Sequence, residues 1–163
     1  MKRTAIYPGT FDPVTYGHID LIKRATRIFE QVIIAVAMHP QKEVLFSLKE
    51  RVQMLKAATA KIPRTNIESF DGLLVNYVKR KKARVMLRGL RMISDFEYEF
   101  QMALTNRRLN PEIETIYMMP NEAYCYLSSK LIKEAASLGA SLRDFVPGFV
   151  EQKLKQRLVK RAK

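Results

Sequence analysis

The sequence predicts an α/β fold in a single domain, with a five-stranded parallel sheet covered by helices on both faces. Short β-rich runs alternate with segments of helical spacing along the whole chain. Two of these runs, QVIIAVA and VML, are continuously apolar, which is typical of central strands covered on both faces. At 163 residues the chain is long enough for one core, and no internal repeat or Pro/Gly-rich linker divides it, so residues 1–163 are treated as one domain.

Five runs are predicted to be strands, and a helical segment follows each of them. The strands cover residues 3–7, 31–37, 66–70, 83–88 and 113–119. The resulting order is βαβαβαβαβα. In an open parallel sheet, ligands bind beyond the carboxyl ends of the strands. Functional side chains should therefore gather just after strand ends.

The helices carry recognisable start and stop signals. Thr15 is predicted to cap the first helix, in which apolar residues recur every three or four positions. Ser47 and Glu50 have the spacing of a capping box, which predicts the start of the second long helix. Gly139 is predicted to end the helix that begins at residues 128–129, as a left-handed cap.

Two further helices are predicted in the second half of the chain. Ser94 and Glu97 again have capping-box spacing, at the start of a helix over residues 94–109. Residues 148–163 are predicted to form a basic, amphipathic surface helix, with Val150 and Leu154 on its apolar stripe.

The charge balance indicates an anionic partner. The chain has 29 Lys and Arg against 16 Asp and Glu, a net charge of +13. Nucleic acid, a membrane surface and a phosphorylated metabolite all remain open on charge alone. No apolar run approaches the ~20 residues that cross a bilayer, and the first residues do not resemble a secretory signal. With a single cysteine, Cys125, these features predict a cytoplasmic protein.

Residues suited to phosphate binding follow four predicted strands. Gly9 and Thr10 follow the first strand, and His39 and Lys42 follow the second. Residues 88–91 follow the fourth strand, and residues 121–129 follow the fifth. Because these strand ends share one edge of the sheet, the segments are expected to converge there.

The first loop is interpreted as a phosphate cradle. Gly9 is expected to adopt a positive φ and to bring the backbone close to a ligand, while Thr10 offers a hydroxyl and an amide. His18 is placed in the first turn of the following helix, where free N–H groups and the helix dipole favour an anion. It is expected to donate a hydrogen bond to a phosphoryl oxygen, without acting as a base.

Other cations and hydroxyls complete the candidate site. Arg88 and Arg91 can bind phosphate in a bidentate manner, and placing both at one strand end is expected to require an anion between them. Ser128 and Ser129 stand at a helix start, which also suits an anion. Residues 79–82 are interpreted as a solvated helix end. P-loop, GxGxxG and zinc-ligand spacings are absent from the sequence, so a Walker ATPase, a dehydrogenase and a zinc site are not indicated.

Three stretches together carry a family resemblance: YPGTFDPVTYGHID, RGLRMISDFEYE and YLSSKLIKE. They resemble the bacterial phosphopantetheine adenylyltransferases, within the nucleotidyltransferase superfamily that has a T/H-x-G-H signature, here residues 15–18. The resemblance implies a Rossmann-like fold. It also implies transfer of the adenylyl group of ATP to 4′-phosphopantetheine with Mg²⁺, by a homohexamer that binds neither nucleic acid nor membrane.

The resemblance also implies residue roles. Thr10 would orient the attacking phosphate, while His18, Lys42 and Arg91 would stabilise the transition state. Contacts to phosphopantetheine would come from Thr10, Lys42, Leu74 and Arg88. Contacts to ATP would come from Thr10, Phe11, His18, Gly89, Leu90, Arg91, Glu99, Tyr124, Cys125, Tyr126, Leu127, Ser128, Ser129 and Lys130. Lys130 stands where many relatives have serine or threonine. No protein metal ligand is expected.

Three other functions are alternatives to this interpretation. A sister nucleotidyltransferase, acting on nicotinamide mononucleotide or glycerol phosphate, would share the signature but differ in its acceptor pocket. A basic RNA-binding module would require aromatic residues among the basic ones, and KRKKARVMLRGLR contains none. A truncated class I synthetase would need a second, lysine-rich signature, which the sequence lacks.

Overall fold

The structure, a computed structural model, describes residues 3–38 and 43–161. The predicted site residues His39 and Lys42 lie outside the described residues. The strands are β1 (Thr4–Gly9), β2 (Gln31–Ala37), β3 (Thr65–Phe70), β4 (Val85–Gly89) and β5 (Glu114–Met118). The helices are α1 (Tyr16–Ile28), α2 (Leu48–Thr59), α3 (Leu74–Arg80), α4 (Ile93–Leu109), α5 (Ser129–Ser137) and α6 (Gly148–Arg161), with a 3-10 turn, η1, at Glu122–Tyr124.

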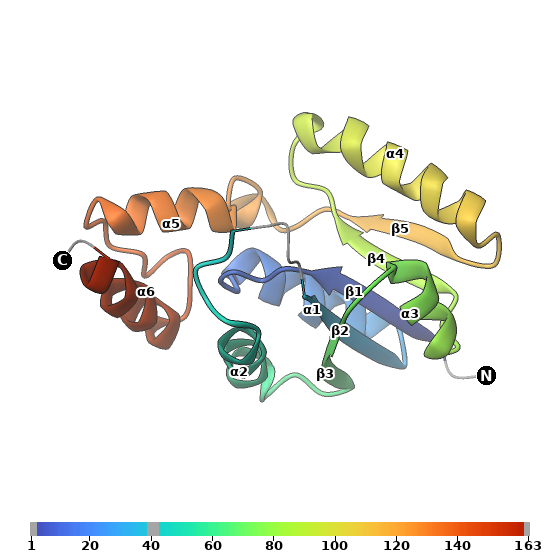
Figure 1. The fold of residues 1–163 in the computed structure, drawn as a ribbon, viewed down its shortest axis with the longest axis horizontal. Helices are drawn as coiled ribbons and strands as arrows, with labels where there is room; N and C mark the ends of the chain where they lie inside the picture. The colour runs from blue at the N-terminus through green and yellow to red at the C-terminus, as the bar shows by residue number, and fades with distance from the viewer. Residues whose placement is uncertain (1–2, 39–42, 162–163) are drawn as a thin grey trace.

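The five strands form one parallel sheet in the order β3-β2-β1-β4-β5. This confirms the predicted Rossmann-like arrangement. The strand order reverses between β1 and β4, where the chain crosses from one half of the sheet to the other. Figure 1 shows α5 and α6 beyond the carboxyl ends of the strands, at the end of the molecule opposite the N-terminus.

Helices cover both faces of the sheet, as predicted. One core joins alternate residues of β1 and β2, such as Tyr7 and Ile34, to the buried sides of α1, α2, α5 and α6. The intervening residues, such as Ile6 and Ile33, pack against α3 on the other face. The α4 helix lies beside β5 (Figure 1). Because both faces are covered, the central strands are apolar throughout, which is why they show no alternation in the sequence.

Most of the predicted helix starts and ends are confirmed. Thr15 and Ser47 each cap a helix with a complete capping box, formed with His18 and Glu50 respectively. Gly139 follows α5 with a φ of 81°, the left-handed conformation expected of a glycine cap.

The capping box predicted at Ser94 and Glu97 is wrong. The α4 helix begins at Ile93, and Met92 caps it without a side-chain hydrogen bond. Ser94 therefore lies inside the first turn, where its hydroxyl cannot reach the third amide of the helix. The serine spacing alone could not place the helix start.

The C-terminal helix is part of the core and not only a surface element. Val150 and Leu154 of α6 are fully buried, and the guanidinium of Arg157 pairs with Glu50 of α2. None of the described helices is both long and apolar enough to cross a lipid bilayer.

Candidate active site

The capping box of α1 fixes the orientation of His18. The Nδ1 atom of His18 accepts a hydrogen bond from the backbone N–H of Thr15, at 3.1 Å. The threonine hydroxyl lies 3.0 Å from the same nitrogen and accepts from the His18 amide. Since Nδ1 accepts a hydrogen bond from a backbone amide, the neutral ring carries its own proton on Nε2. That N–H is free to donate to a ligand at the helix start.

The surroundings of His18 keep its imidazole neutral. Burial, together with the positive charges of Arg91 and Arg88, lowers the pKa of His18 to about 4. The two arginines of the β4 end and the histidine of α1 therefore act on one another, as the convergence at the sheet edge predicted. At neutral pH the ring is a hydrogen-bond donor through Nε2 and carries no charge.

Gly9 has a different role from the one predicted. It does not adopt a positive φ, whereas Phe11 does, with a φ of 51°. This conformation turns the Phe11 ring back over Gly9, so that a Cβ on Gly9 would lie 2.8 Å from two ring carbons. The buried Phe11 ring also packs edge-on against His18, with centroids 5.0 Å apart. Glycine is needed here for close packing and not for its φ.

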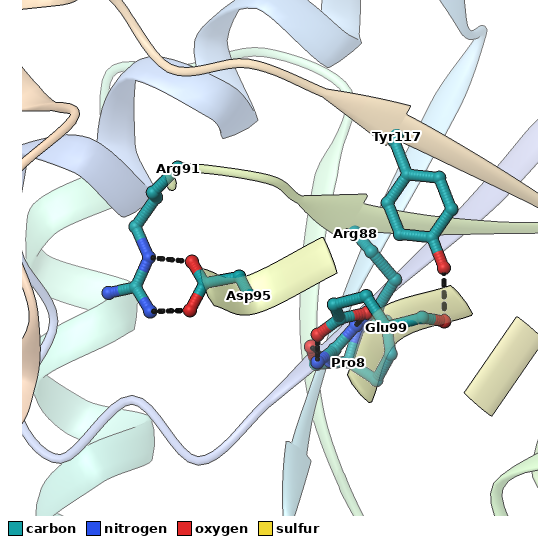
Figure 2. Close-up of polar contacts among 6 residues, drawn as sticks. All are labelled: Pro8, Arg88, Arg91, Asp95, Glu99 and Tyr117. Atoms are coloured by element: carbon teal, nitrogen blue, oxygen red, sulfur yellow. Dashed lines mark hydrogen bonds and ion pairs between the residues drawn. The ribbon is translucent and has the colours of Figure 1, made fainter. Parts of the chain in front are cut away.

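Arg88 is held by a carboxylate from α4 (Figure 2). Its guanidinium makes a two-point ion pair with Glu99 and donates to the carbonyl of Pro8 at 3.1 Å. Burial acts to lower the pKa of Arg88, but the hydrogen bonds and charge of Glu99 outweigh it and raise the pKa. Arg88 is therefore a fixed, permanently charged group at the end of β4.

Arg91 has its own carboxylate partner. Its Nε donates to Asp95 at 3.1 Å (Figure 2). Its Nη1 donates to the carbonyl of Leu127 at 2.9 Å. The expectation that the two arginines need an anion between them is therefore wrong. Each guanidinium is paired with a carboxylate of α4, at positions 95 and 99, one helical turn apart. Asp95, in the first turn of α4, positions Arg91.

A small groove with a volume of about 20 Å³ lies between α3, α4, β4 and β5, and Arg88 is part of its lining. Two predicted phosphopantetheine residues, Leu74 and Arg88, line it, together with Glu99. Glu99 is thus in the same groove as those two residues, although the resemblance assigns it to ATP. The sequence analysis did not single out the other lining residues, which are Met86, Met102, Ala103, Asn106, Thr115 and Tyr117.

Helical spacing could have identified part of this groove. The residues at positions 99, 102, 103 and 106 follow the i, i+3, i+4, i+7 pattern and so share one face of α4. Of these, Glu99 and Asn106 are buried. This face of α4 therefore presents to the groove a carboxylate that pairs with Arg88 and an amide, beside Met102 and Ala103.

The segment predicted to hold ATP lies against the start of α1. The rings of Tyr16 and Tyr124 are 6.1 Å apart, and the Tyr124 carbonyl is within 3.5 Å of the Cβ position of Gly17. Ser128 caps α5 by accepting from the amide of Leu131. Ser129 donates to the carbonyl of Pro13 at 2.8 Å.

The remaining predicted ATP residues differ in exposure. Leu127 is buried, Cys125 is half-buried, and Tyr126 and Lys130 are exposed. Leu90 donates its backbone N–H to Met118 at 3.0 Å, and the Cβ position of Gly89 is 2.7 Å from Leu21, so α1 packs closely against the end of β4. Thr10 is half-buried, beside the turn that carries Phe11.

A larger cavity of about 690 Å³ lies between the start of α1 and α6. It is lined by Tyr16, Ser141, Arg143, Gly148, Glu151, Gln152 and Lys155. None of the predicted site residues lines it. We place the candidate site at the β1 and β4 ends instead, because the neutral imidazole, the two fixed arginines and the groove meet there.

Comparison with known proteins assigns the class. Residues 6–135 match the cytidylyltransferase-like family, so the chain belongs to the nucleotidyltransferases. A solved structure from Vibrio parahaemolyticus, described as a nicotinate-nucleotide adenylyltransferase, superposes with a TM-score of 0.70 over 94% of this chain and 99% of its own. At 15% identity, this similarity establishes the fold alone.

Closer relatives narrow the assignment. The phosphopantetheine adenylyltransferase of Caldanaerobacter subterraneus subsp. tengcongensis is 53% identical over 97% of this chain and 99% of its own. That of Desulfatibacillum aliphaticivorans is 48% identical over 97% of this chain and 90% of its own. The chain belongs to the phosphopantetheine adenylyltransferase family.

Proposed function

We propose that the protein transfers the adenylyl group of ATP to 4′-phosphopantetheine, giving dephospho-coenzyme A and pyrophosphate in the penultimate step of coenzyme A synthesis. The observation that carries this proposal is the neutral, oriented imidazole of His18 beside Arg88 and Arg91. Family membership supports the identity of the acceptor. The small groove lined by Leu74 and Arg88 lies beside the proposed position of the acceptor phosphate.

In the proposed reaction, a phosphate oxygen of phosphopantetheine attacks the α-phosphorus of ATP. A new P–O bond forms, the bond between the α-phosphorus and the bridging oxygen breaks, and pyrophosphate leaves with the bonding electrons. The nucleophile is already ionised at neutral pH, so no protein base is required. Catalysis then consists of alignment and charge stabilisation.

The residue roles follow from this chemistry. Thr10 orients the attacking phosphate at the end of β1. The Nε2–H of His18 donates to an oxygen of the α-phosphoryl group as negative charge grows there. Arg91 and Lys42 supply positive charge, Arg88 binds the acceptor phosphate, and residues 124–130 hold the nucleotide.

Magnesium is proposed to arrive with the triphosphate. Within residues 3–38 and 43–161, no group of three or more His, Cys, Asp or Glu side chains could hold a metal ion. A Mg²⁺ ion usually keeps several waters and binds substrate phosphates, so it does not need a protein cage.

A homohexamer in the cytoplasm is the proposed state of the protein. Apolar side chains on α4 support self-association, since Ile93 is 92% exposed and Phe96 and Phe100 are each 49% exposed. A reducing compartment agrees with a chain that has a single cysteine. Light scattering after gel filtration tests the assembly, and a monomer at micromolar concentration would contradict it.

Pyrophosphate release tests the proposed activity. The protein is mixed with ATP and Mg²⁺, and with 4′-phosphopantetheine, nicotinamide mononucleotide or glycerol phosphate as the acceptor. Release with 4′-phosphopantetheine alone is the expected result. Release only with nicotinamide mononucleotide would instead assign the protein to the sister group of nucleotidyltransferases.

A further inference from the structure

Two buried charged side chains, Asp12 and Arg51, connect the loop after β1 to other parts of the fold. Asp12 is 3% exposed and Arg51 is 2% exposed. The reaction proposed above uses neither of them. A buried charge is costly unless it is paired and hydrogen-bonded, so the partners of these groups indicate what they hold in place.

The Asp12 carboxylate bonds to two separate segments. It accepts the backbone N–H groups of Leu45 and Phe46, each at 2.9 Å. It also accepts from the ammonium of Lys133 on α5, at 2.7 Å. Asp12 follows Thr10 by only two residues, so both segments are attached to the loop that carries Thr10.

Arg51 of α2 strengthens the first of these attachments. Its Nη1 donates to the carbonyls of Thr10 and Ala37, at 2.8 and 2.9 Å. Its Nε donates to the carbonyl of Phe46 at 3.2 Å. The end of β2 and the start of α2 are therefore both fixed to the Thr10 loop.

The second attachment involves the helix that follows the proposed nucleotide segment. Ser129, at the start of α5, donates its hydroxyl to the carbonyl of Pro13 at 2.8 Å. Together with the ion pair of Lys133 and Asp12, this bond holds α5 to the loop at two points one helical turn apart.

We propose that Asp12 is a positioning residue that couples the two sides of the active site through the loop carrying Thr10, with Lys133 as its partner on α5. This inference rests on the proposed function. Because one carboxylate holds both the 45–46 segment and α5, losing either bond lets the two sides move relative to Thr10. Attack of one bound phosphate on another is sensitive to such displacements, since an error of ~1 Å can cost ~10²-fold in rate.

Three variants test the coupling. Lys133→Met removes only the ion pair, from a side chain that is 28% exposed, and Lys133→Arg keeps the charge. Asp12→Asn keeps the shape of the side chain, but the new amide NH2 then faces one of the groups that donate to the Asp12 carboxylate. Lys56→Met, at an exposed position of α2, is the matched control.

A positioning role predicts a fall in kcat that is larger than any change in KM. For Lys133→Met, kcat should fall about tenfold or more at a temperature where the variant is fully folded. Lys133→Arg should recover part of the loss, and Lys56→Met should match the parent protein. The double variant should be no slower than Asp12→Asn alone, because the two residues act as one unit.

Amide hydrogen exchange gives a readout that does not depend on activity. In Lys133→Met, exchange at the amides of Leu45 and Phe46 should accelerate, although Lys133 touches neither. Unchanged exchange there, or a kcat within about threefold of the parent, would overturn the proposal. If Asp12→Asn does not fold, the results for Lys133→Met alone decide whether Asp12 has the proposed positioning role. If the parent releases no pyrophosphate with 4′-phosphopantetheine, the proposed function fails, while the exchange experiment still tests the coupling.

Discussion

Replacing His18 separates its two functions, donating to the phosphoryl group and completing the capping box of α1. Alanine removes both. Glutamine is a natural residue for the third position of a capping box, so His18→Gln keeps an acceptor for the Thr15 N–H but no longer places a ring N–H at the α-phosphate. The two variants should therefore share a catalytic defect and differ in stability.

The magnitudes follow from the two sets of contacts. Loss of one preorganised transition-state donor costs ~10²–10³ in kcat, or about 2.7–4 kcal/mol. Both variants should show this loss. The capping contact contributes about 1 kcal/mol, which for a domain of 150–250 residues corresponds to a Tm about 2–4 °C lower. Only His18→Ala should show that decrease.

The assay is steady-state pyrophosphate release with both substrates saturating, alongside thermal unfolding followed by circular dichroism. The KM values should change less than kcat, because the donor acts on charge that develops in the transition state. A His18→Ala variant within about threefold of the parent in kcat would refute the assignment of His18 to the transition state.

The remaining predictions concern protonation and packing around the same residues. Burial, with the charges of Arg91 and Arg88, lowers the pKa of His18 to about 4 from an ordinary 6.5, so the unfolded chain takes up the proton first as pH falls. Parent stability should therefore decline between pH 6.5 and 4 more steeply than that of His18→Gln, in urea titrations. Glu99→Gln removes the charge that pairs with Arg88, and it should cost about 2 kcal/mol of stability and raise the KM for phosphopantetheine more than that for ATP. Gly9→Ala should displace the Phe11 ring that packs on His18, and should lower kcat roughly tenfold.

For each of these variants, one experimental result would contradict the expected effect. Parallel stability curves for the parent and His18→Gln across the acid range would mean that His18 is not held neutral by the fold. Equal rises in both KM values for Glu99→Gln would separate Arg88 from acceptor binding. Gly148→Ala is the control for Gly9→Ala, since nothing lies within 4 Å of its Cβ position. If both variants have the parent kcat, the Phe11 ring does not position His18.

Local sequence signals identified most of the elements and several site residues. Strands and helices follow from the periodicity of the apolar residues, which is set by the backbone geometry of each element. Because parallel strands end at one edge, the position of Thr10 and Arg88 after strands was enough to predict that they converge. Thr15 was identified as a cap because a side-chain oxygen at that position satisfies a free amide three residues later.

The failed predictions concern side-chain contacts that no local sequence pattern specifies. Gly9 is a glycine because of the Phe11 ring, and the φ of Phe11 is set by the fold around it. Glu99 was assigned to the nucleotide, and Asp95 was assigned to no site, yet both carboxylates are bound by arginines of the β4 end. No local pattern distinguishes a carboxylate that caps a helix from one that pairs with a cation on a neighbouring element.

The sequence by itself determined the α/β fold class, the order of the elements and the edge of the sheet that carries the chemistry, because these depend on periodicity and on chain direction. Only the tertiary structure decided the tautomer and neutrality of His18, the groove between α3 and α4, and the Asp12 contacts with the 45–46 segment and α5. The tautomer depends on a contact only three residues away, whereas the neutrality of His18 depends on burial, and the Asp12 contacts span more than thirty residues of sequence. They arise only when the chain has packed.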